Sequence, residues 1–67
     1  MILQTTLKER RTKAGMTQAA LADAVGVSRK TINTVENGVF VPSTLLALRI
    51  AKVLDVTVEQ LFQLGAD

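Results

Sequence analysis

The side chains that could carry chemistry in this 67-residue chain are lysines, arginines, carboxylates and amides, because the sequence contains neither cysteine nor histidine. Disulfides, thiolate metal sites, the commonest zinc ligand and the commonest general base are thereby excluded. The carboxylates Asp23, Glu36, Asp55 and Glu59 have no paired spacing that would indicate a shared acid–base site. The sequence therefore predicts no enzyme, no metal site and no cofactor.

The basic residues are concentrated in the first half of the chain. Residues 1–35 contain six basic and two acidic residues, a net +4, whereas residues 36–67 contain two basic and four acidic ones, a net −2. This asymmetry favours one face for a polyanion and another for a different partner, and a solvated surface of mixed charge is the alternative. Phe40 and Phe62 are the only aromatic residues, which disfavours a base-stacking surface for single-stranded nucleic acid.

Helix-start and helix-stop signals follow one another along the chain and leave almost no room for strands. Glycines suited to helix ends follow the first three predicted helices. Pro42 biases the residue before it, Val41, to an extended form. Glu9 and Gln60 stand where they complete capping boxes. The prediction is one compact all-α domain over residues 1–67, with helices at 7–14, 18–25, 29–37, 44–54 and 58–64, capped by Thr6, Thr17, Ser28, Ser43 and Thr57.

The spacing within residues 18–37 is the most informative part of the sequence. Ala22 supplies the small residue that two crossing helices need, and Gly26 can adopt the positive φ of a tight turn. An apolar set would seal the two helices together, and a polar set falls on the opposite face of the second one. The apolar set is Leu21, Val25, Val27, Ile32 and Val35, and the polar set is Arg29, Lys30, Asn33 and Thr34.

This pattern is a helix-turn-helix, and matching segments continue outside it. Together they resemble the XRE/Cro–C1 family of lambda-repressor-like transcriptional regulators, over about residues 6 to 64. The segments are Gly15-Met16-Thr17-Gln18, Gly26-Val27-Ser28-Arg29, Thr31-Ile32, Val35-Glu36-Asn37-Gly38, Pro42-Ser43 and Ile50-Ala51-Lys52-Val53-Leu54. The resemblance implies a five-helix lambda-repressor-like bundle that binds double-stranded DNA with the third helix in the major groove.

The resemblance also implies residue roles. Base edges would be contacted by Arg29, Lys30, Asn33 and Thr34, and phosphates by Thr17, Gln18, Ser28 and Asn37. Arg11 and Glu36 would form a structural salt bridge between the first and third helices. The family often carries a basic residue at the position of Val39, whereas the loop here, Gly38-Val39-Phe40-Val41-Pro42, is apolar.

The fourth predicted helix is apolar on nearly all sides, which requires burial on more than one face. This helix has more apolar residues than a single core can bury, and Leu45 and Leu48 are the surplus ones. Val58 and Phe62 add to the apolar surface. A chain of this length buries only about 60% of its unfolded surface, which favours an oligomer. We therefore expect a homodimer interface within residues 44–64, and a well-filled monomer core is the alternative.

The function expected from the sequence is a dimeric, sequence-specific DNA-binding transcriptional regulator that reads a palindromic operator and blocks or contacts RNA polymerase. The alternative is an antitoxin-like protein-interaction subunit whose apolar face binds a partner protein. The sequence Met1-Ile2-Leu3-Gln4 lacks the apolar region of a secretory signal, and no stretch is long enough to span a bilayer. We therefore expect a cytoplasmic protein with no membrane partner.

Overall fold

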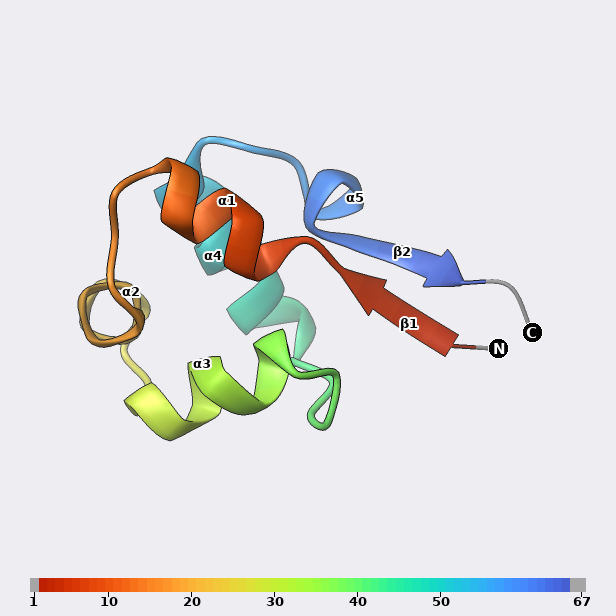
Figure 1. Ribbon diagram of the computed structural model, residues 1–67, viewed down its shortest axis with the longest axis horizontal. Helices are drawn as coiled ribbons and strands as arrows, with labels where there is room; N and C mark the ends of the chain where they lie inside the picture. Colours follow the sequence, from red (N-terminus) through yellow and green to blue (C-terminus); the bar gives the residue numbers. More distant parts are fainter. Residues whose placement is uncertain (1, 66–67) are drawn as a thin grey trace.

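The computed structural model describes residues 2–65 and contains five helices and a two-stranded sheet. The strands β1 (Ile2–Thr5) and β2 (Phe62–Gly65) lie side by side at one end of the molecule, and α2 lies at the other (Figure 1). The helices are α1 (Leu7–Lys13), α2 (Gln18–Val25), α3 (Arg29–Glu36), α4 (Thr44–Leu54) and α5 (Val58–Leu61). The predicted five-helix lambda-repressor-like bundle is confirmed, with the sheet as an addition.

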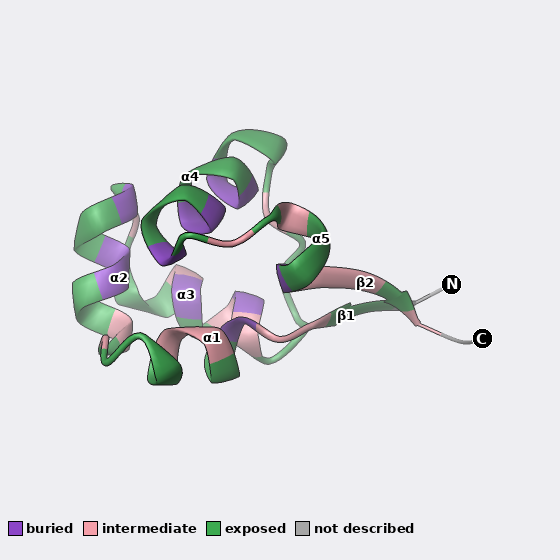
Figure 2. Ribbon diagram, turned by 90° about the horizontal axis from the view of Figure 1, so that it is seen from above, coloured by how far each residue is buried: buried purple, intermediate pink, exposed green. Residues whose placement is uncertain are grey.

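The core lies between the helices and is entirely apolar. Buried segments alternate with exposed ones along α2, α3 and α4, as expected for amphipathic helices packed against one another (Figure 2). Helix α2 packs against α3 and α4, α1 packs against α3, and α5 packs against α4. The residues with no exposed surface are Leu7, Leu21, Ile32, Ile50 and Leu61.

Four of the predicted caps are present. The side chains of Thr17, Ser28 and Ser43 each accept a hydrogen bond from the backbone N–H three residues later. Thr57 and Gln60 form the predicted capping box, in which each side chain accepts from the other's backbone N–H. These hydrogen bonds satisfy N–H groups that have no partner inside their own helix, and they fix where each helix begins.

The predicted cap at Thr6 is wrong, because its hydroxyl is used elsewhere. Thr6 Oγ1 donates to the carbonyl of Gln60 at 2.6 Å, and the backbone N–H of Thr6 donates to the carbonyl of Leu61 at 2.9 Å. Thr5 Oγ1 accepts from the Leu7 N–H at 3.1 Å in its place. The start of α1 is thereby tied to the carbonyls at the end of α5, which would otherwise lack donors.

The fifth helix is shorter than predicted. It ends at Leu61, and Phe62 already has extended backbone angles of φ −130° and ψ 130°. Residues 62–65 pair antiparallel with residues 2–5, with Thr5 opposite Phe62 and Leu3 opposite Leu64. The prediction of helix to residue 64 is therefore wrong. Hydrogen bonding to a distant strand replaces the local helical pattern here.

Candidate nucleic-acid interface

Helices α2 and α3 and the turn between them form the predicted helix-turn-helix. Ala22 is buried at the crossing, and its carbonyl accepts from the N–H of Val27 at 3.0 Å. Gly26 has φ +77°, which an L side chain rarely adopts. Because Ile32 and Val35 of α3 are buried against α2 and the core, the opposite face of α3 is turned outward.

The outward face of α3 carries the polar residues predicted to read bases. Arg29, Lys30 and Asn33 are exposed, whereas Thr34 is half-buried and its hydroxyl donates to the carbonyl of Thr31 at 2.9 Å. The amide of Asn37, at the end of the helix, donates to Asn33 Oδ1 at 2.6 Å. The structure thus places four predicted contact residues on one face, with Thr34 less accessible than the others.

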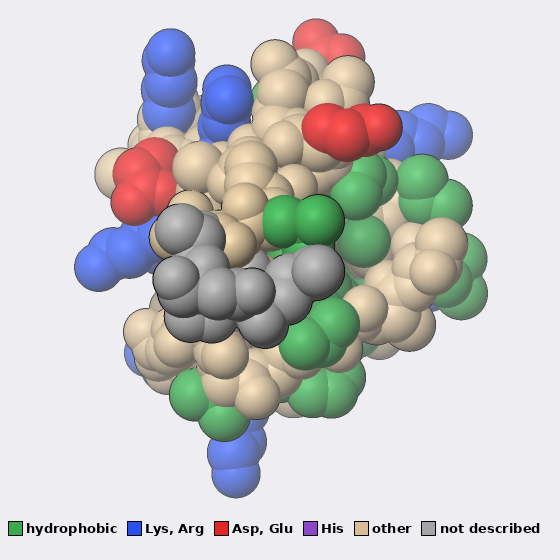
Figure 3. All heavy atoms as spheres, turned by 90° about the vertical axis from the view of Figure 1, so that its right-hand side faces the viewer, with side chains coloured by type: hydrophobic (Ala, Val, Ile, Leu, Met, Phe, Trp, Pro, Cys, Tyr) green, Lys and Arg blue, Asp and Glu red, His purple; other side chains and the backbone are tan. Residues whose placement is uncertain are grey.

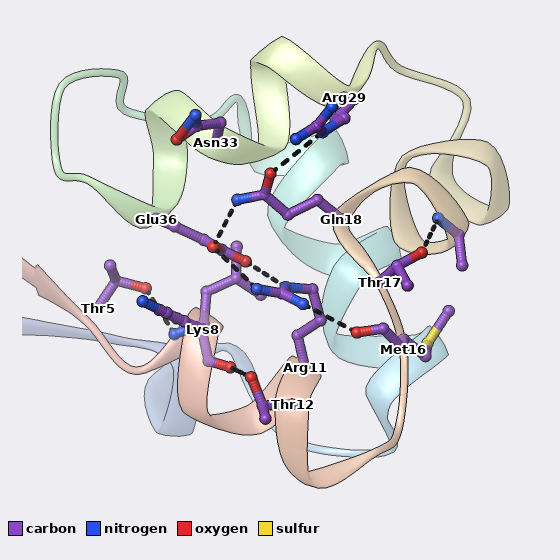
Figure 4. Close-up of polar contacts among 12 residues, drawn as sticks. Thr5, Lys8, Arg11, Thr12, Met16, Thr17, Gln18, Arg29, Asn33 and Glu36 are labelled. Carbon is purple, nitrogen blue, oxygen red and sulfur yellow. Dashed lines mark hydrogen bonds and ion pairs between the residues drawn. The ribbon is translucent and has the colours of Figure 1, made fainter.

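Gln18 connects the start of α2 to both ends of α3. Its Nε2 donates to Glu36 Oε1 at 3.0 Å, and its Oε1 accepts from Arg29 Nε at 3.5 Å (Figure 4). Neither contact is predicted from the sequence. A glutamine next to a helix start suggests a surface contact, and only the crossing angle of the two helices brings it between Glu36 and Arg29.

Arg11 of α1 and Glu36 of α3 form the ion pair that the family resemblance implied. Arg11 Nε lies 2.5 Å from Glu36 Oε2, and Nη2 lies 3.3 Å from Oε1. Arg11 Nη1 also donates to the carbonyl of Met16 at 2.9 Å. The pair therefore fixes α1 and the segment before α2 against the end of α3.

The same contacts determine the charge state of Glu36, whose side chain is only 3% exposed. Burial alone would raise the pKa of Glu36, but the hydrogen bonds from Arg11 and Gln18, with the charges of Arg11 and Lys8, outweigh it and lower the pKa below its usual value. The hydrogen bond to Glu36 in turn raises the pKa of Arg11. Glu36 is thus a fixed negative charge behind the polar face.

The hydroxyl groups at the starts of α2 and α3 both cap their helices. Thr17 Oγ1 accepts from the Ala20 N–H at 3.0 Å, and Ser28 Oγ accepts from the Thr31 N–H at 3.2 Å. A hydroxyl that accepts a capping bond keeps its own proton for another acceptor. Capping and a phosphate contact are therefore compatible at Thr17. Ser28 Oγ also pairs with Thr31 Oγ1 at 3.0 Å, so its proton is available to a phosphate when the Thr31 hydroxyl is the donor of that bond.

The apolar residues predicted for a dimer interface do not share one surface. Leu48, Val58 and Phe62 line an open hollow of about 630 Å³, together with Leu3 and Val41. Leu45 lines a separate hollow of about 290 Å³ beside Phe40 and Arg49. Figure 3 views the end of the molecule that carries the sheet and shows hydrophobic side chains gathered on one part of that face.

Two proteins with similar sequences are described as transcriptional regulators. The helix-turn-helix family model HTH_3 matches residues 7–61. The chain is 47% identical over 60 residues to an uncharacterized HTH-type transcriptional regulator of Archaeoglobus fulgidus, covering 90% of this chain and 86% of the relative. It is 40% identical over 62 residues to the uncharacterized HTH-type transcriptional regulator YgzD of Bacillus subtilis, covering 92% and 94% of the two chains.

A solved structure agrees with this relationship. The restriction-modification controller protein C.AhdI of Aeromonas hydrophila superposes with a TM-score of 0.75 at 33% identity, over 81% of this chain and 82% of that one. The fold and the outward polar helix thus define a helix-turn-helix DNA-binding protein. The chain belongs to the HTH_3 helix-turn-helix family of XRE/Cro–C1 type and is an HTH-type transcriptional regulator.

Two further findings concern the described part of the chain. Within residues 2–65, no three acidic side chains gather as a metal site would require. No helix of that range is long and apolar enough to cross a bilayer.

Proposed function

We propose that this regulator binds a specific double-stranded operator by inserting α3 into the major groove. The observation that carries the proposal is the division of α3 into a buried apolar face and an outward face bearing Arg29, Lys30 and Asn33. Arginine and lysine suit guanine O6 and N7, asparagine suits adenine, and the methyl group of Thr34 suits thymine. These four residues are the proposed base contacts.

Phosphate contacts would come from both sides of α3. Thr17 and Gln18 stand at the start of α2, where free backbone N–H groups and the helix dipole favour an anion. Gln18 uses one amide proton for Glu36 and keeps the second for a phosphate oxygen. Ser28 and Asn37 at the two ends of α3 complete the proposed set.

The proposed active form is a symmetric dimer that uses the hollow lined by Leu48, Val58 and Phe62. A twofold axis requires a self-complementary surface, because each residue of one copy meets a residue of the other. Lys52 and Glu59 also line this hollow, so opposite charges can face each other across the axis. The second copy is therefore the occupant we propose, with two α3 helices about 34 Å apart on successive major grooves.

Regulation would follow from occupancy of a promoter, either by excluding RNA polymerase or by contacting it. A selection of bound sites from random duplex DNA tests the proposal directly. Enrichment of a palindrome whose half-sites are about one DNA turn apart is the expected result. If no sequence is enriched and the purified protein is a monomer, the hollow would instead serve a partner protein, as in an antitoxin.

A further inference from the structure

The loop that joins α3 to α4 exposes apolar side chains to solvent beside the polar outward face of α3. Val39, Phe40 and Val41 are 79%, 47% and 67% exposed. Such side chains cannot neutralise a phosphate, which is the contact that the family pattern would place at Val39. Their exposure next to α3 therefore indicates a contact other than one with phosphate.

This loop is folded onto α3 and does not project away from it. The N–H groups of Val39 and Phe40 both donate to the carbonyl of Thr34, at 3.0 and 3.2 Å. Gly38 makes the reversal possible with φ +73°. In consequence the Phe40 side chain shares a shallow hollow of about 180 Å³ with Lys30 and Thr34.

Phe40 and Gln18 lie on opposite flanks of α3. Gln18 contacts Arg29 and Glu36, whereas Phe40 adjoins Lys30 and Thr34. At about 100° per residue, Arg29 and Glu36 point in nearly the same direction around the helix axis, and Thr34 points about 140° away from Arg29. The outward face of α3 thus has a polar flank at Gln18 and an apolar flank at Phe40.

We propose that Phe40 contacts the 5-methyl group of a thymine at one edge of each half-site. Thymine alone presents a methyl group in the major groove, and an apolar side chain recognises it by contact. Phe40 would therefore read sequence, while Gln18 on the other flank holds a phosphate. This inference rests on the proposed function, because it takes α3 as the helix in the groove.

The test uses the operator enriched from random duplexes and replaces its thymines with deoxyuridine, one at a time. Each replacement removes a single methyl group and leaves base pairing unchanged. The wild-type protein should lose affinity about fourfold at one thymine per half-site, which is the factor expected for burying one methyl group. Phe40→Ala should bind the thymine and deoxyuridine duplexes equally well at that position.

Three variants separate Phe40 from other sources of the effect. Thr34→Ser removes the other candidate methyl contact, and it should abolish sensitivity at a different thymine. Phe40→Leu keeps an apolar side chain and should retain part of the sensitivity. Val53→Ala changes an exposed apolar residue on α4, away from this loop, and should behave like the wild type. Circular dichroism establishes that each variant is folded.

The outcomes are distinguishable. The assignment of Phe40 is overturned if Phe40→Ala keeps the full loss of affinity on removal of the thymine methyl group. It is also overturned if the only thymine methyl group that affects wild-type binding is one whose effect Thr34→Ser abolishes. Should Phe40→Ala not fold, Phe40→Leu decides by the same criterion. If the selection enriches no duplex at all, it is the proposed function that fails.

Discussion

Helices α3 and α4 are both amphipathic, but the outer face of α3 is mainly polar and that of α4 is largely apolar. α3 buries Ile32 and Val35, and polar side chains dominate its remaining surface. α4 buries five residues and still exposes Leu45, Leu48 and Val53. A polar outer face suits a hydrated, charged ligand, whereas a large exposed apolar surface is usually covered by another protein surface. The outer side of α3 is thus the face we propose for DNA, and the side of α4 that carries Leu48 is the face we propose for association.

The largest expected effect concerns the α3 face and its response to salt. If each subunit neutralises about three phosphates, a dimer releases the counterions of about six, and the log–log slope of affinity against salt is about −5. Raising salt from 50 to 200 mM should then weaken binding by about a thousandfold. Titrations at a series of salt concentrations measure the slope, and a slope near zero would contradict a phosphate-binding role for this face.

The next effect concerns the α4 face. Leu48→Glu should raise the dimer dissociation constant by at least about a hundredfold, because a charge would be buried without a partner. Leu45→Glu is the matched control: the two leucines are 56% and 59% exposed on the same helix, but only Leu48 lines the hollow with Val58 and Phe62. Light scattering at micromolar concentration compares them. Equal dimerisation of both variants would place the interface elsewhere.

A smaller effect tests whether α3 reads bases. Arg29→Ala should lower affinity for the operator about tenfold or more and affinity for scrambled DNA much less, because a good base contact discriminates by roughly 1–3 kcal/mol. Arg49→Ala removes an exposed arginine from α4 and controls for the loss of one positive charge. Equal losses on operator and scrambled duplexes would make Arg29 a phosphate contact.

The smallest effect concerns the ion pair behind the α3 face. The pKa of Glu36 is lower in the folded protein than in the unfolded chain, so its contribution to stability is present above the unfolded pKa of about 4.3 and is lost as pH falls through the folded value. Glu36→Gln should cost about 1 kcal/mol at pH 7 and less at pH 3, which lies below the unfolded pKa. Denaturant unfolding at both pH values measures this.

The exposed Glu9 of α1 provides the control for that comparison. Glu9→Gln removes the same charge from a side chain outside the Arg11–Glu36 contact, and it should leave the stability at pH 7 within about 0.5 kcal/mol of the wild type. A loss in Glu9→Gln as large as in Glu36→Gln would attribute the effect to net charge.

Local chemistry made α2, α3 and α4 predictable. Thr17, Ser28 and Ser43 each cap a helix, and Gly26 takes the positive φ that the turn needs, so these starts and stops are encoded within a few residues. The outward position of Arg29 also follows from the 3.6-residue period. The sequence does not predict that Leu45 and Leu48 line separate hollows, because this depends on which neighbouring elements border each side of α4.

What sequence reasoning missed depends on contacts between distant segments. The predicted cap at Thr6 and the last turn of the fifth helix were both plausible locally, but the hydroxyl of Thr6 satisfies the carbonyl of Gln60, and Phe62 pairs with Thr5. The link from Gln18 to Arg29 and Glu36 likewise requires the packed arrangement of α2 and α3. No local pattern contains these contacts.

The pairing of β1 with β2 has a consequence for how the chain is made in the cell. Thr5 and Leu61, which are joined by a hydrogen bond, are 56 residues apart. A ribosome adds about 5–20 residues per second, so β1 waits on the order of 3 to 10 s for its partner to be synthesised. During that interval the nascent chain carries an unpaired strand that contains Leu3. The two strands can therefore pair only after translation has passed β2.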